Sequence, residues 1–210
     1  NTKGKIKTGY IGAFFLLLVS FLVTFFANRQ LVSKVKDVEE TNKIISNLES
    51  ILSSVKDAEI GIRGYIISRN KDFLEPYLNS QKREDSIFKE TEKQVSDNPK
   101  QILLLKDLKI NIDKKFLVIK SALVSFNKNN LQLTPSLRDS LDISKRLMDS
   151  IRADIHHLQE IERKMLQERA AQLNKSTVAV YRIVLASIII SFFLVDFGLT
   201  SHQKKNDEKI

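Results

Sequence analysis

Two strongly apolar runs lie near the ends of this 210-residue chain, and a long polar segment separates them. The first run covers residues 8–28. The second covers residues 182–201 and includes Arg182 at its start and one acidic residue, Asp196. A helix needs about 20 mostly apolar residues to cross a bilayer, so both runs are long enough. The pattern predicts two transmembrane helices, with residues 29–181 displayed on one side of the membrane.

A cleaved signal peptide is the alternative interpretation of the first run. Such peptides have an apolar core of about 7–15 residues, followed by a small-x-small cleavage site. The run here is longer, and no such site follows it. These differences favour a membrane span that stays in the protein.

Short basic flanks predict the orientation of the two spans, because Lys and Arg near a span stay on the cytoplasmic side. Three lysines precede the first span and three follow the second. Residues 1–7 and 202–210 are therefore expected in the cytoplasm, the latter as the start of a linker. Residues 29–181 are expected outside the cytoplasm, periplasmic or extracellular. The lipid bilayer is the first predicted partner.

The net charge of +9 does not indicate a nucleic-acid-binding protein. Six of the 34 basic residues are the flanking lysines, and basic and acidic residues alternate through the polar segment. Interleaved charge of this kind is typical of solvated helix surfaces. With no cysteine in the chain, no disulfide supports the displayed domain, which must be stable by packing alone.

Apolar residues at steps of three and four predict four helices in the polar segment. The first continues the first span up to Arg69, and the second ends near Val95. Their predicted buried faces include Val35 in the first helix and Leu78 in the second. The fourth has no Gly or Pro from Ser136 to Phe197 and is expected to enter the second span without a break.

Helix start and stop signals divide the segment at the same places. Asn70 is a plausible left-handed residue ending the first helix. Asp72 and Glu75 fit a capping box for the second. Asn98 before Pro99 is a predicted N-cap for the third, and Thr134 precedes the start of the fourth.

The predicted fold is all-α. Short loops favour antiparallel neighbours, so we expect an up-down-up-down four-helix bundle flanked by two transmembrane helices. An irregular all-helical domain is the alternative.

Two regions of the polar segment carry a resemblance to a known family. Residues 57–68 read DAEIGIRGYIIS and residues 72–77 read DFLEPY; the second region runs from Met148 to Arg169. Together they resemble the CHASE domain of the third type, an extracellular sensory domain found before histidine kinases, diguanylate cyclases and methyl-accepting chemoreceptors. The usual glycine near position 70 is replaced here by Asn.

The resemblance singles out nine positions as a candidate sensory or structural signature. They are Glu59, Arg63, Gly64, Tyr65, Glu75, Tyr77, Arg152, Glu162 and Arg169. A structural interpretation competes with the sensory one: Arg63 can pair with Glu59 one turn away, and Gly64 can permit close approach of another helix. In that case Tyr65 and Tyr77 close the membrane-distal end of the core.

Few other residues suggest chemistry. His156 and His157 point to different helix faces, so they cannot bind one metal together. Asp196 is an ionisable group within a predicted span, and such groups are costly there; it is a candidate for transmembrane signalling or marks the inner boundary. No catalytic motif, metal site or cofactor site is expected.

The predicted function is therefore that of a sensory input module in the bacterial cytoplasmic membrane. The resemblance favours a two-component sensor histidine kinase that acts as a homodimer, with its catalytic part beyond residue 210 and an unknown extracytoplasmic ligand. A diguanylate cyclase or chemoreceptor output is the alternative. A two-span protein that only binds a partner is a further alternative.

Overall fold

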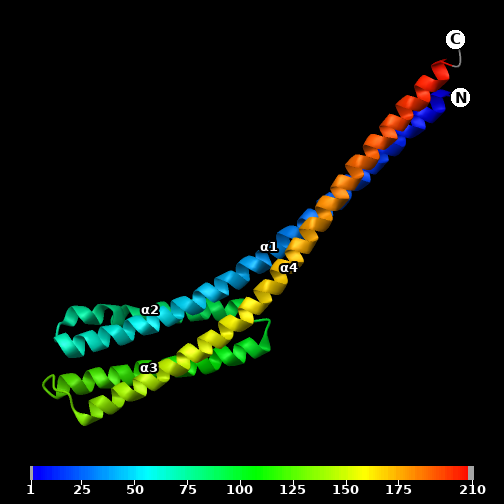
Figure 1. Ribbon diagram of the computed structural model, residues 1–210. Coiled ribbons are helices and arrows are strands. Elements are labelled where there is room, and N and C mark those ends of the chain that lie inside the picture. Colours follow the sequence, from blue (N-terminus) through cyan, green and yellow to red (C-terminus); the bar gives the residue numbers. More distant parts are fainter. Residues whose placement is uncertain (1, 208–210) are drawn as a thin grey trace. The chain divides into compact units, whose positions relative to one another are not determined.

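A computed structural model describes the backbone of residues 2–207 and the side chains of residues 11–200, apart from positions 13, 16, 194 and 197–199. This part of the chain is helical and contains no strand. Its elements are α1 (Thr2–Ser68), the short 3-10 helix η1 (Lys71–Leu74), α2 (Glu75–Gln94), α3 (Pro99–Lys128) and α4 (Pro135–Asp207) (Figure 1). Both predicted continuous helices are confirmed, since α1 and α4 each run without a break.

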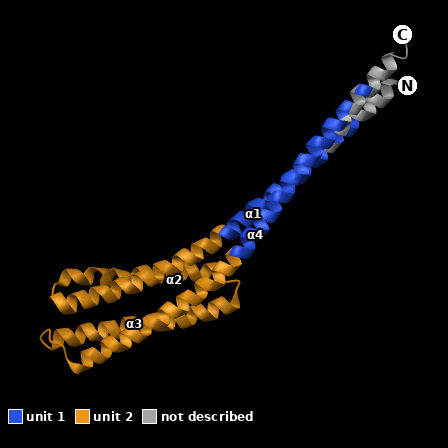
Figure 2. Cartoon of the chain, in the orientation of Figure 1, with its two compact units in different colours: residues 1–38, 167–210 blue, residues 39–166 orange. Residues whose placement is uncertain are grey.

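The chain divides into two compact units, which Figure 2 shows in different colours. Unit 1 comprises residues 1–38 and 167–210, and so contains the beginning of α1 and the end of α4. Unit 2 comprises residues 39–166 and contains the remaining parts of these helices together with η1, α2 and α3. The polar segment that resembles a sensory domain falls mainly in unit 2.

Cross-helix contacts fix the direction of each helix in unit 2. Between two antiparallel helices, the residue numbers of contacting pairs rise in one helix while they fall in the other. The pairs Lys43–Glu90 and Asp57–Arg83 show this for α1 and α2, and the pairs Gln101–Glu162, Asn111–Asp154 and Lys115–Ser144 show it for α3 and α4.

The helices α1 and α4 are also joined directly. Gln159 of α4 donates to Glu49 of α1. Lys115 of α3 bridges Ser144 of α4 and Glu59 of α1. The contacting residue numbers therefore fall along α4 as they rise along α1. α1 is thus antiparallel to both α2 and α4, and the predicted up-down-up-down bundle describes unit 2.

Buried residues follow a regular three-and-four spacing in the bundle. In α3 the buried positions are Gln101, Leu105, Leu108, Ile112, Lys115, Ile119, Ala122 and Phe126, with Phe116 beside them. The same spacing occurs in α1 and α4, and it is the heptad spacing of helices that pack at small crossing angles. Most of the predicted apolar faces are therefore confirmed.

Two residues were assigned to the wrong side. Leu78 is 67% exposed and Val35 is 38% exposed. In α2 the buried face instead runs through Ser80, Glu84, Phe88 and Thr91. A search for apolar periodicity could not find this face, because three of its four residues are polar.

The predicted N-terminal caps of α3 and α4 are confirmed. The Asn98 side chain accepts a hydrogen bond from the backbone N–H of Gln101, and the Thr134 hydroxyl accepts one from Leu137. α3 and α4 then begin at Pro99 and Pro135, where the missing N–H costs nothing.

The predictions for the turn between α1 and α2 were wrong in detail. Arg69, not Asn70, has the left-handed conformation, with φ of 58°. Asn70 is extended and caps η1, because its side chain accepts from the N–H of Asp72. The capping box expected at Asp72 does not form there, since η1 occupies these residues and α2 begins at Glu75.

Unit 1 carries large apolar side chains that are exposed along both helices. Phe14 is 70% exposed, Phe21 65% and Phe192 74%. The hydroxyls of Ser20 and Ser187 lie 2.7 Å apart and link α1 to α4.

Within the described residues, α4 contains one stretch that is long and apolar enough to cross a membrane. The first predicted span, residues 8–28, includes side chains outside the described set, as do the predicted cytoplasmic segments 1–7 and 202–210.

Candidate functional site

The end of α1 packs closely against η1 through two glycines. A Cβ atom at Gly61 would lie 2.6 Å from the backbone oxygen of Phe73, and one at Gly64 would overlap the Phe73 ring. The close approach expected at Gly64 is therefore present, but its partner is a side chain of η1. Gly61, which the sequence analysis did not single out, meets backbone instead.

This difference predicts unequal effects of substitution. Gly61→Ala should lower the melting temperature more than Gly64→Ala, because a backbone carbonyl cannot rotate away, whereas the half-exposed Phe73 ring can. Overpacking costs about 1–3 kcal/mol, or several degrees in a domain of this size. Thermal unfolding of the two variants followed by circular dichroism tests the order. Equal melting temperatures would contradict the packing argument.

Tyr65 closes the core at the same end of the bundle. It is 3% exposed, its ring meets Phe126 edge to face, and its hydroxyl donates to the side-chain oxygen of Asn127 over 2.7 Å. Tyr77 is half-buried, and burial raises the pKa of its hydroxyl. Both tyrosines thus occupy the closing positions that the structural interpretation gave them.

A buried polar cluster joins α1, α3 and α4. The Lys115 side chain is fully buried, and its Nζ lies 2.8 Å from Glu59 and 2.9 Å from both the carbonyl and the hydroxyl of Ser144. Glu59 also pairs with Arg63 over 2.6 Å, as predicted. Burial lowers the pKa of Lys115, and the hydrogen bond to Glu59 opposes this shift. Glu59 therefore holds two cations.

A groove beside this cluster is a candidate ligand surface of unit 2. Its volume is about 290 Å³. The lining residues are Arg63, Ile66, Ile67, Leu133, Leu141, Asp142 and Lys145. Its aliphatic side chains lie beside two cations and the carboxylate of Asp142, and this mixture suits a small amphipathic molecule that has an anionic end.

A second polar cluster joins α2 to α3. The Nζ of Lys109 lies 3.0 Å from Glu84, 2.5 Å from Asp85 and 3.1 Å from Asp113. Glu84 is fully buried, and burial raises the pKa of its carboxyl to about 7, although Lys109 acts in the opposite direction. Burial opposes a charge on Lys109, but its three carboxylate partners outweigh burial and raise its pKa.

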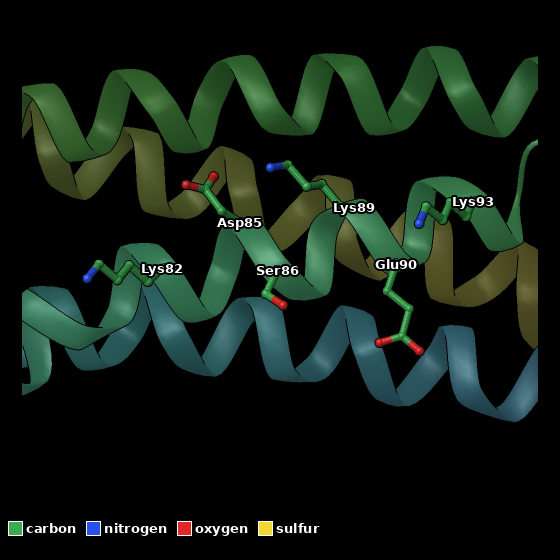
Figure 3. Close-up of a pocket in the computed structure, with 6 residues that line it drawn as sticks. All are labelled: Lys82, Asp85, Ser86, Lys89, Glu90 and Lys93. Atoms are coloured by element: carbon green, nitrogen blue, oxygen red, sulfur yellow. The ribbon is translucent and has the colours of Figure 1, made fainter.

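A shallow hollow on the outer side of α2 is not a comparable site. Figure 3 shows the side chains that line it, and they diverge along one helix. Its two acidic residues already serve as cross-helix partners: Asp85 binds Lys109 of α3 and Glu90 binds Lys43 of α1. This surface is best described as the solvated face of α2.

Three signature residues lie apart from this end of the bundle. Arg152 pairs with Asp149 on the α4 surface. Glu162 is buried and accepts from Gln101 of α3. Arg169 lies in unit 1, where it donates to the backbone oxygen of Asp37.

Glu75 and Asp196 are the remaining two candidates. Glu75 is exposed in the first turn of α2. Asp196 is exposed in unit 1, and its backbone oxygen accepts from the Thr200 hydroxyl. The structure thus gathers six of the ten candidate residues at one end of the bundle and leaves the other four elsewhere. The six are Glu59, Arg63, Gly64, Tyr65, Glu75 and Tyr77.

Sequence reasoning missed the two buried cluster residues, Lys115 and Glu84. Lys115 falls in the buried register of α3, three residues after Ile112 and four before Ile119. A charged residue in that register was the available signal. Among the described residues, no group of three or more His, Asp or Glu side chains could hold a metal ion.

Comparison with protein families decides the classification. A family model described as the CHASE3 domain matches residues 34–172, well over half of the chain. The chain belongs to the CHASE3 domain family. The CHASE3 match covers all of unit 2 and extends into unit 1. It supports a sensory input module of a signalling receptor. No curated protein sequence matches this CHASE3 chain significantly.

A solved structure has a similar fold. It is the sensor domain of the histidine kinase HK9 from Rhodopseudomonas palustris, with 20% sequence identity and a TM-score of 0.51. The match covers 60% of this chain and 98% of the other. At this identity the likeness concerns the fold alone, and it agrees with a helical bundle as the CHASE3 architecture.

Proposed function

We propose that this chain is the membrane-anchored, extracytoplasmic input module of a bacterial sensor histidine kinase. The observation that carries the proposal is the position of the CHASE3 match, residues 34–172, between two apolar runs. Both runs expose large apolar side chains, such as Phe14 and Phe192, and exposure of so many apolar groups to water is unfavourable. A bilayer would cover them.

The proposed topology has two spans and places both termini in the cytoplasm. Basic flanks at both ends support it. The receptor would act as a homodimer, and the fold it shares with a histidine kinase sensor domain favours a kinase output over a cyclase or chemoreceptor output.

The groove beside Arg63 and Lys145 is the proposed ligand site. A ligand anion there would compete with Glu59 for Arg63, since these two side chains lie 2.6 Å apart. Release of Glu59 would alter its bond to Lys115, which connects α1 to α3 and α4. The site would thereby link occupancy of the groove to the packing of three helices.

Cysteine labelling tests the topology, and the natural chain has no cysteine that would interfere. Cysteine placed at Ser96, an exposed residue of unit 2, should react with a membrane-impermeant maleimide in intact cells. Cysteine placed at Thr2 should react only after the cells are lysed. Labelling of the Thr2 variant in intact cells would overturn the assignment.

A further inference from the structure

The outermost positions of α3 are apolar over the whole length of the bundle. Leu103, Ile110, Leu117 and Val124 recur every seven residues and are 63%, 50%, 64% and 45% exposed. Each lies two residues before a buried position, such as Leu105, on the side of the helix that faces away from the core. At 1.5 Å per residue, this outer stripe is about 32 Å long.

The corresponding positions in the other helices are mainly polar. In α4 they hold Asp139, Arg146, Ala153 and Glu160, and in α2 they hold Ser86 and Lys93. In α1 they change from Glu39, Ser46 and Ser53 to Ile60 and Ile67 only near the end of the helix. A solvated bundle face does not require four aliphatic side chains in succession, so the α3 stripe indicates a contact surface.

We propose that the α3 outer stripe binds the same stripe of a second copy of this chain, with the two α3 helices parallel. A two-fold axis along the pair places each of the four apolar residues beside its own counterpart. The proposal deepens the homodimer of the proposed function and rests on it for orientation, since two copies anchored in one membrane point the same way.

Charges beside the stripe support a parallel pair. One side carries Lys106 and Asp113, and the other carries Asp107 and Lys114; all four are exposed, and Asp113 also pairs with Lys109 of its own helix. In a parallel two-fold pair, the side of one α3 that carries Lys106 faces the side of the second α3 that carries Asp107. Lys106 then meets Asp107 of the second copy, and Asp113 meets Lys114.

An antiparallel pair has the opposite charge pattern. In an antiparallel pair, each side of α3 faces the same side of the second α3. With the stripes aligned, Asp113 then meets Asp113 of the second copy and Lys114 meets Lys114. Like charges across a helix pair are destabilising. The arrangement of charges therefore selects the second copy in the parallel orientation.

Disulfide cross-linking of the full chain in membranes tests this proposal. Single cysteines replace Ile110 or Leu117, and an oxidant is added. Each variant should form a covalent dimer with itself, because a two-fold axis brings each position next to its counterpart. Ala153→Cys, at the outermost position of α4, is the matched control and should remain monomeric on denaturing gels.

The outcomes separate the alternatives. Cross-linking of Leu103→Cys with Val124→Cys, but of neither with itself, would show an antiparallel pair and overturn the proposal. No cross-linking at any of the four stripe positions would also overturn it. Topology labelling is independent of this result, so a failed stripe does not count against the membrane-anchored sensory module.

A charge exchange tests the orientation by rescue. In the Ile110→Cys background, Lys106→Asp creates two acidic contacts and should lower the cross-linking rate on the order of threefold. Adding Asp107→Lys restores opposite charges across a parallel pair and should restore the rate. A double variant that remains as slow as the single variant would contradict the parallel arrangement.

Discussion

Glu59→Leu is expected to destabilise the protein by about 3–5 kcal/mol, which is the cost of leaving a buried charge without its partner. Lys115 has no exposed surface, and Glu59 is the acidic group bonded to it. The hydrogen bonds to Ser144 would remain, but they do not neutralise the ammonium group. A loss of about 10 °C in melting temperature should follow.

A double variant shows whether the charge is responsible. Glu59→Leu combined with Lys115→Met removes both ions and fills their volume with apolar groups, which often restores stability. We expect the double variant to melt well above Glu59→Leu. If the two melt together, lost packing at position 59 explains the effect and the charge argument fails.

Glu84 should make stability decrease as the pH rises from about 4.5 to 7. The folded carboxyl has a pKa of about 7 and the ordinary value is 4.5, so the folded state holds this proton more tightly. Its contribution is complete below pH 4.5 and is lost as the pH rises through 7. The shift corresponds to about 3 kcal/mol for this buried group.

The Glu84→Gln variant isolates this contribution. Gln cannot ionise, so the melting temperature of the variant should change less between about pH 5 and pH 8 than that of the natural protein. Glu90→Gln is the matched control, because Glu90 lies on the same helix but is exposed and pairs with Lys43 outside the Lys109 cluster, and it should keep the natural slope. Parallel pH profiles for Glu84→Gln and the natural protein would exclude Glu84 as the cause.

Much of the bundle could be predicted because its signals are local. Pro99 and Pro135 each follow a capping residue, and these signals fixed the starts of α3 and α4. Apolar spacing located the cores of α1, α3 and α4. The turn after α1 could not be predicted in the same way, since the left-handed conformation fell on Arg69, a residue with no preference for it.

The polar interior was harder to predict because its residues depend on partners distant in sequence. Lys115 is separated from Glu59 by 56 positions, and Lys109 from Glu84 by 25. Neither pair follows from helical spacing within one element. Gly61 shows the same limit, since only the position of Phe73 in η1 explains why a side chain cannot be accommodated there.

The composition of α2 has a consequence for fluctuations of the native state. Phe88 is the one apolar residue among the four buried positions that the structure describes in this helix. Regions with few buried apolar contacts open locally at a free energy below that of global unfolding. α2 is therefore the helix whose amide hydrogens should exchange with solvent by partial opening, while α3 remains protected. A stimulus that acted through α2 would need to supply only the free energy of that local opening.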